Sequence, residues 1–165
     1  MPARVSESFV LRTYPFKEGD LIVSFLDREE GKLRGVAKRA RKPKSPFGAG
    51  LERLSRVRMA YFHRENAELV TLTSCELIDS PLSMKTDYGL SLALDFFTEI
   101  AEQLLPPHEP NEKFFRLLIS VMEYLRKGGS IWAAIPYVSL WTVRLTGVLP
   151  EMRVSDEAAE IAEEM

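Results

Sequence analysis

Hydrophobic residues recur at two different spacings along the chain, and the spacing changes near Ser80-Pro81. Before this point apolar residues alternate with other residues at period two, which is typical of half-buried strands. Turn residues at 18–20 and 29–31 separate the first runs, and residues 64–67 supply a hairpin loop between the last two. The pattern predicts five short strands, around residues 9–11, 21–25, 33–37, 57–62 and 69–77. Five strands in so short a stretch favour a closed or nearly closed barrel, because closure removes exposed edges.

After Pro81 the spacing becomes three and four, which indicates helices. The first helix ends at Pro106-Pro107, and its apolar face is formed by Leu90, Leu94, Phe97, Ala101 and Leu104.

The second helix begins at Asn111, a good N-cap, and ends at Gly128-Gly129. Its inward residues are expected to be Phe114, Leu117, Leu118, Val121 and Leu125. A third helix capped by Ser130 passes Trp132 and ends near Gly147, and Pro136 either kinks it or moves its start. The acidic stretch 155–165 either forms a weak amphipathic helix capped by Ser155 or stays frayed.

These elements predict an α+β protein with a barrel domain at 1–79 and a small α-helical domain at 80–165. The length of 165 residues and the hydrophobic content of 45% suit one ordinary domain or two small ones. Cys75 is the only cysteine, so it cannot form an internal disulfide or supply a Cys-rich zinc site. With no apolar run of about 20 residues and no signal core, the expected location is the cytoplasm.

The net charge of −2 conceals a charge asymmetry between the two halves. Residues 1–79 hold 15 Lys and Arg against 11 Asp and Glu, a net +4, whereas residues 80–165 hold 7 against 13, a net −6. Such asymmetry suggests two surfaces with different partners.

The strongest chemical signal is a basic segment between Lys32 and Arg64, in which Glu52 is the only acidic residue. Lys and Arg side chains that neutralise phosphates release counterions, so this composition favours nucleic-acid binding over a merely solvated face. The small residues 48–50 would let the backbone approach a ligand closely. The candidate DNA-contacting residues are Lys38, Arg39, Arg41, Lys42 and Lys44, with Arg56 and Arg58 on the neighbouring strand and Phe47 as a base-stacking ring.

Some of the aromatic residues have an ordinary structural interpretation. Phe47 and Tyr61 can instead fill the barrel core, and for Tyr61 we expect this alternative. Tyr61 and His63 would stack on bases only if they face outward.

Residues for catalysis are sparse. The two histidines, His63 and His108, lie in different halves, and Cys75 has no histidine near it in sequence. The chain has no phosphate-binding glycine loop, no nucleophile elbow and no zinc-protease motif. We therefore expect a protein that is not an enzyme and that uses no metal and no cofactor.

At this point the sequence resembles the bacterial RecO recombination-mediator family, from about Glu7 to Glu151. The segments that carry the resemblance are FVLRTYPFKEGDLIVSFLDREEGKL, GVAKRARKPKS and LSRVRMAYFHRENAELVTLTSCELIDSP, followed by the helical segments 88–105 and 141–151. Their order and spacing are more specific than any one of them alone.

The resemblance implies an N-terminal OB-fold that binds single- and double-stranded DNA, followed by a helical domain. It implies strand annealing and recombinase loading in DNA repair and recombination. It also implies two protein partners, RecR and the acidic C-terminal tail of the single-strand-binding protein.

Three departures from the family pattern stand out. Arg39 occupies a position where the family commonly has glycine, and Pro46 one where it often has a basic residue. Many members also continue past 149–151 into a Cys-rich zinc-binding segment, so this chain is either a natural short form or a truncation. The helical domain is then incomplete relative to the family, which bears most on the RecR interaction.

Two further functions remain open at this point. One is a non-catalytic protein-interaction adaptor whose basic loop contacts an acidic protein, and the other is an RNA-binding OB-fold protein. Binding of bare oligonucleotides distinguishes a DNA-binding protein from the adaptor. Competition between DNA and RNA distinguishes it from the RNA-binding protein.

Overall fold

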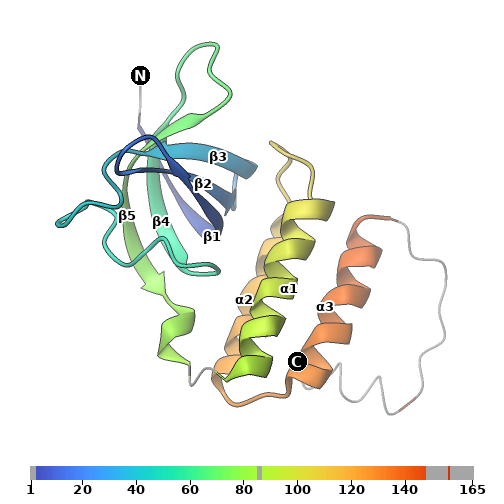
Figure 1. Cartoon of the computed structure of the whole chain (residues 1–165). Coiled ribbons are helices and arrows are strands. Elements are labelled where there is room, and N and C mark those ends of the chain that lie inside the picture. The colour runs from blue at the N-terminus through green and yellow to red at the C-terminus, as the bar shows by residue number, and fades with distance from the viewer. Residues whose placement is uncertain (1–2, 85–86, 148–155, 157–165) are drawn as a thin grey trace.

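The chain folds into a β-barrel followed by three helices, as the change of hydrophobic period predicts (Figure 1). The computed structural model describes residues 3–84, 87–147 and 156. The strands are β1 (Arg4–Phe16), β2 (Asp20–Asp27), β3 (Gly31–Ala37), β4 (Arg56–Phe62) and β5 (Val70–Asp79). They close in the order β1-β2-β3-β5-β4, in which β3 and β5 are parallel and the other neighbours antiparallel. This is the five-stranded barrel of an OB-fold.

The long first strand closes the barrel and also reaches the helices. Its first part pairs with β4, and its later part pairs with β2. An irregularity between Val10 and Arg12 shifts the register. Leu11 is the extra residue at this irregularity. Because successive strand residues point to opposite faces, Val10 joins the barrel core while Leu11 joins the core beneath the helices.

The barrel interior contains one buried carboxylate, Asp27, whose hydrogen bonds are satisfied. Ser6 Oγ donates to Asp27 Oδ1 at 2.9 Å, and the Tyr61 hydroxyl donates to Oδ2 at 2.7 Å. The backbone N–H groups of Glu29 and Glu30 also donate to Oδ1. Burial and the hydrogen bond to Asp27 raise the pKa of Tyr61, so the phenol stays protonated. Tyr61 is a core residue, as expected.

The helices are α1 (Tyr88–Leu104), α2 (Glu112–Arg126) and α3 (Ile131–Leu145), preceded by a short 3-10 turn at Pro81–Ser83. The predicted caps are confirmed: Asn111 Oδ1 accepts from Phe114 N–H, and Ser130 Oγ accepts from Trp132 N–H. The predicted inward face of α2 is entirely buried.

The helix ends differ from the sequence prediction in detail. Leu104 is 49% exposed, and Leu105 is buried in its place. The helix ends here, because the backbone of Leu105 is in an extended conformation. Trp132, in the first turn of α3, is 80% exposed. Pro136 lies inside α3, which begins at Ile131 after the Ser130 cap, so it does not move the start of the helix. The acidic stretch expected to be helical or frayed lies outside the described residues, apart from Asp156.

The helices pack against one outer side of the barrel through a shared apolar core. Four barrel residues belong to the same buried cluster as the helices, namely Phe9, Leu11, Leu26 and Leu54. The connector between α1 and α2 also touches β3, where His108 N–H donates to the Lys32 carbonyl at 3.0 Å. A Cβ at Gly31 would lie 2.4 Å from the Glu109 carbonyl oxygen, so this close approach requires glycine.

Charged pairs surround the apolar junction between barrel and helices. Arg28 contacts Glu112 of α2 at 2.6 Å and Glu7 of β1 at 2.9 Å. The hydrogen bond to Glu112 raises the pKa of Arg28, and the same bond lowers the pKa of Glu112. On the α1 side, Arg12 pairs with Glu99. The helices are therefore held to the barrel by both apolar packing and ion pairs.

Candidate nucleic-acid interface

The basic loop, residues 38–44, follows β3 and is fixed by backbone contacts to the turn between β1 and β2. Arg41 N–H donates to the Gly19 carbonyl at 3.0 Å, and Arg39 N–H donates to Asp20 Oδ1 at 2.8 Å. The Lys42 stem lies over Gly19, where an added Cβ would come within 2.7 Å of Lys42 Cε. The loop backbone is thus positioned by hydrogen bonds from main-chain N–H groups, and these bonds do not involve the charged side chains of the loop.

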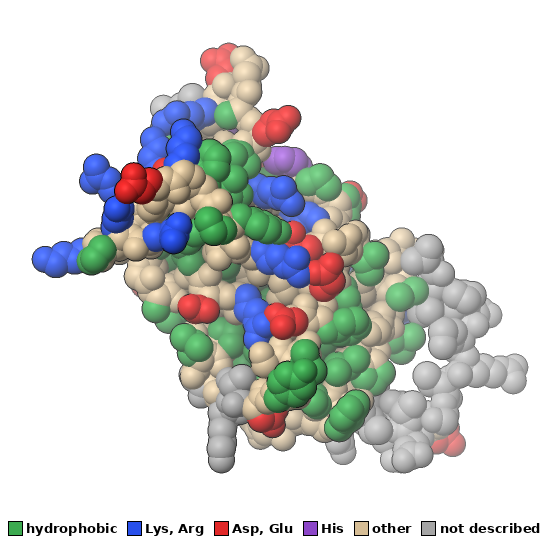
Figure 2. Space-filling model, viewed as in Figure 1, with side chains coloured by type: hydrophobic (Ala, Val, Ile, Leu, Met, Phe, Trp, Pro, Cys, Tyr) green, Lys and Arg blue, Asp and Glu red, His purple; other side chains and the backbone are tan. Residues whose placement is uncertain are grey.

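The loop carries five exposed cations, which are Lys38, Arg39, Arg41, Lys42 and Lys44. Within the part of the chain that the structure describes, none of the five pairs with a carboxylate. Arg39 and Lys44 adopt left-handed backbone conformations, with φ of 57° and 59°. Figure 2 shows Lys and Arg side chains gathered over the barrel on the side away from the helices. The sequence-predicted loop cations are therefore brought together on one surface.

The two arginines proposed on β4 differ from the loop cations and from each other. The Arg56 side chain is only 23% exposed, and it contacts Glu7 at 3.2 Å and Asp79 at 2.9 Å. The Arg58 side chain is 58% exposed and lies 3.7 Å from Glu76. Arg56 is thus mostly buried and already paired with two carboxylates, which makes it less available to a phosphate than Arg58.

Phe47, predicted from the sequence as a base-stacking ring, does not belong to the candidate site. Its side chain is buried in the barrel core, together with residues from all five strands. The Cys75 thiol donates to the Phe47 carbonyl at 3.1 Å, which fixes this part of the loop against β5. A ring in this position cannot stack on a base, and the alternative core interpretation holds.

Sequence reasoning missed two aromatic residues near the loop, Tyr14 and Phe16 at the end of β1. Their rings lie close to cations, with Arg34 at 6.0 Å from Tyr14 and Lys17 at 5.2 Å from Phe16. The signal that could have found them is the alternation of Arg12, Tyr14 and Phe16 at period two on one strand face.

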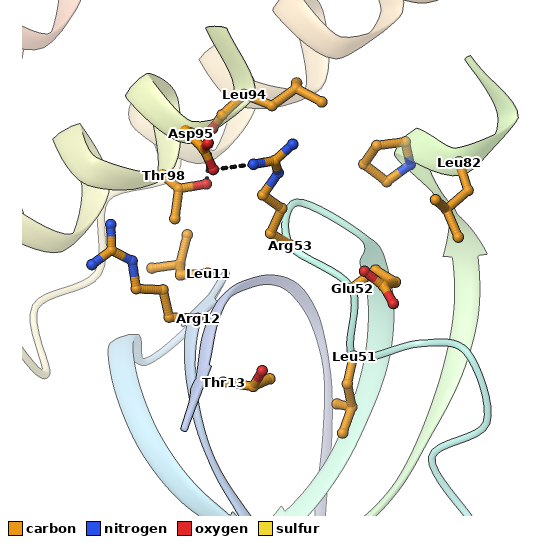
Figure 3. A pocket seen from close by; sticks show the side chains of 11 residues that line it. Leu11, Arg12, Thr13, Leu51, Glu52, Arg53, Leu82, Leu94, Asp95 and Thr98 are labelled. Atoms are coloured by element: carbon orange, nitrogen blue, oxygen red, sulfur yellow. Dashed lines mark hydrogen bonds and ion pairs between the residues drawn. The ribbon is translucent and has the colours of Figure 1, made fainter. Parts of the chain in front are cut away.

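A groove of about 420 Å³ lies between the barrel and α1 (Figure 3). Its two arginines already have partners: Arg53 pairs with Asp95 and donates to Ser91 Oγ at 3.0 Å, and Arg12 pairs with Glu99. Apolar side chains such as Leu11 and Leu94 also line it. The groove belongs to the junction between barrel and helices, and its cations are less available to an anion than those of the loop.

Reactive groups are few among the described residues. Burial raises the pKa of the Cys75 thiol to about 11, so it is protonated at neutral pH and is a poor nucleophile. The described residues include no cluster of three or more His, Cys, Asp or Glu side chains suited to a metal ion. Among the described helices none combines the length and the apolar character needed to cross a bilayer.

A closed five-stranded OB-type barrel that carries an unpaired basic loop, followed by a helical domain, defines a class of protein that includes many nucleic-acid binders. The comparisons with known proteins identify the family. Residues 1–81 match the family model for the recombination protein O N-terminal domain, and residues 85–155 match the model for its C-terminal domain. The chain belongs to the RecO family.

Curated relatives agree with the family models. A DNA repair protein RecO from Koribacter versatilis is 46% identical over 147 residues, which cover 89% of this chain and 60% of the relative. RecO proteins from Cutibacterium acnes and Thermodesulfovibrio yellowstonii are 35% and 30% identical, over 78% and 90% of this chain. These matches cover 52% and 59% of the two relatives, so the chain spans little more than half of their length.

Proposed function

We propose that this chain is a non-catalytic DNA-binding recombination mediator in DNA repair. In this role it anneals complementary single strands and assists the loading of recombinase onto DNA coated with single-strand-binding protein. Its ligands are single- and double-stranded DNA, and its protein partners are the single-strand-binding protein and a RecR-like protein. The observation that carries the DNA-binding part is the group of five exposed loop cations without an acidic partner among the described residues.

The chemistry of the loop supports contact with phosphates. An unpaired Lys or Arg on a fixed backbone binds a phosphate without first giving up a carboxylate. Phosphate contacts carry no sequence information, so the loop is expected to bind DNA of any sequence. Arg58 on β4 is a further candidate for a phosphate contact because its side chain is 58% exposed, whereas Arg56 contributes through the structure of the barrel.

The test is annealing of two complementary DNA strands, followed by fluorescence energy transfer, with and without a single-strand-binding protein. Acceleration of annealing by the chain in both conditions supports the proposal. An annealing rate equal to that of the DNA alone in both conditions contradicts the annealing activity.

The adaptor function is the second candidate, and exposed apolar residues on the helices favour it. Tyr88, Leu92 and Phe96 recur every four residues on α1, and all three are exposed. An adaptor binds protein without binding bare oligonucleotides, so titration with a labelled oligonucleotide separates the two functions. An RNA-binding function predicts that RNA displaces a labelled DNA strand at lower concentration than unlabelled DNA does.

A further inference from the structure

An open strip of sheet lies between the helices and the basic loop, on the outer face of the barrel. Arg12, Tyr14 and Phe16 share one face of β1 because alternate residues of a strand point the same way. Arg12 pairs with Glu99 of α1, which shows that this is the outer face. Tyr14 is 37% exposed, and Phe16 is partly exposed.

The strand register shows where the helical cover ends. Arg12 lies opposite Ser24, which lies opposite Arg34, and Ser24 Oγ donates to Glu102 near the end of α1. The next row away from the helix is Tyr14, Ile22 and Val36. These cross-strand neighbours are close enough to form one continuous apolar strip. The strip therefore begins at the row where the contact with α1 stops.

The other end of the strip reaches the basic loop. Phe16 lies opposite Asp20 on β2, and Asp20 Oδ1 accepts the hydrogen bond from Arg39 N–H at 2.8 Å. The adjacent Gly19 carbonyl accepts from Arg41 N–H. Figure 2 shows hydrophobic side chains lying among Lys and Arg side chains on this part of the barrel. An extended ligand can thus contact the rings and the loop cations at the same time.

Each ring has a cation beside it, Arg34 at Tyr14 and Lys17 at Phe16. Aromatic rings on a positively charged surface are the combination that binds single strands, because bases stack on the rings while cations follow the backbone. A long Lys or Arg side chain beside a ring can turn to a phosphate and leave the ring to a base. If each ring and its cation had only a structural role, they would cover the sheet surface, and the protein would not prefer a strand with bases over one without them.

We propose that Tyr14 and Phe16 stack on successive bases of a single DNA strand whose phosphates continue along the basic loop. The proposal rests on the DNA binding proposed above and specifies its ligand, because the bases of a duplex are already stacked within the helix. It predicts that this surface distinguishes a strand with bases from a strand of the same charge without them.

The experiment compares two labelled probes, a thymidine oligonucleotide of about 15 residues and an abasic deoxyribose-phosphate strand of equal length. The parent chain is titrated with each probe by fluorescence anisotropy, beside the variant Tyr14→Leu/Phe16→Leu. Leucine keeps an apolar side chain on the strip and removes the ring. The control variant is Tyr88→Leu, which removes an exposed ring from α1 instead.

Stacking is worth about 1–3 kcal/mol per base, so two rings should favour the thymidine strand by at least about 25-fold in the parent. The double variant should lose most of this preference and keep the slope of log affinity against log salt, because no charge is removed. Tyr88→Leu should keep both the preference and the slope.

The outcomes separate this inference from the DNA-binding proposal. A parent chain that binds both strands equally overturns the stacking while leaving phosphate binding in place. A double variant that retains the full preference overturns the assignment to these two rings. A parent chain that binds neither strand overturns DNA binding, and the stacking with it. If the double variant fails to fold in a thermal melt, the comparison of the two strands with the parent chain still decides whether bases are stacked.

Discussion

Replacement of three loop cations, in the variant Arg39→Ala/Arg41→Ala/Lys42→Ala, should weaken DNA binding without unfolding the protein. Each phosphate contact contributes about 0.7 to the salt slope for a single strand and about 0.9 for a duplex. Three lost contacts should flatten the slope by about 2 for single strands and about 3 for duplex. Extrapolated from 1 M salt, a change of about 2 corresponds to a loss of roughly 100-fold in affinity near 0.1 M.

The fold should survive because the loop is anchored by backbone groups. The hydrogen bonds to Gly19 and Asp20 use the N–H groups of Arg41 and Arg39, and alanine keeps both. Loss of the Lys42 stem over Gly19 removes only exposed packing. The change in the free energy of unfolding should therefore stay within about 0.5 kcal/mol.

The assay is anisotropy titration of a labelled oligonucleotide at several salt concentrations, beside a thermal melt. A charge-matched control removes three exposed cations from the helical half, in the variant Lys113→Ala/Arg116→Ala/Lys127→Ala. The control should keep the slope of the parent. The reasoning is refuted if the loop variant binds as tightly as the parent with the same slope. If the control variant flattens the salt slope as much as the loop variant does, the effect comes from net charge and not from a binding site at the loop.

Three further predictions concern single residues. Arg39→Gly should raise the free energy of unfolding by up to about 1 kcal/mol, because glycine adopts the left-handed φ of 57° without strain, and it should weaken DNA binding; denaturant melts and titrations measure the two effects. Glu112→Gln should lower stability near neutral pH by less than about 1 kcal/mol. Because the hydrogen bond to Arg28 lowers the pKa of Glu112 in the folded protein, the ionised carboxylate stabilises the fold above its unfolded-state pKa. In melts, the difference in stability between the parent and the variant should disappear as the pH falls through the lowered pKa of the folded state. Phe47→Ala should cost about 3–5 kcal/mol of stability with unchanged DNA affinity of the folded protein, and equal stability in urea melts would contradict its core position.

The elements that the sequence predicts well are those whose pattern is local. Alternation at period two determines the strands, and the capping side chains of Asn111 and Ser130 mark the starts of two helices. Phe47 could not be placed in this way, because it lies in a loop without periodicity and joins a core formed mainly by strands distant in sequence. The exposure of Tyr14 likewise depends on where α1 ends on the sheet, which is a tertiary property.

Charge counting also has a physical limit, which Arg56 illustrates. The sequence places it among other cations, yet the barrel brings it against Glu7 and Asp79, which are far from it along the chain. The strand register explains both contacts: Asp79 lies opposite Arg56, and Glu7 lies diagonally across from it, two residues before Phe9, which is opposite Arg56. A count of Lys and Arg residues therefore overestimates the charge available to a ligand.

The same argument changes the meaning of the asymmetry between the two halves of the chain. Three arginines of the barrel pair with three carboxylates of the helices, in the pairs Arg12–Glu99, Arg28–Glu112 and Arg53–Asp95. Part of the opposite charge on the two halves is thus complementary within the molecule, where it holds the helices on the barrel. The loop cations are different because none of their side chains forms an ion pair with an acidic group among the described residues. Added salt should accordingly weaken both the ion pairs between barrel and helices and the binding of DNA. Replacement of the loop cations by alanine should change only the salt dependence of DNA binding.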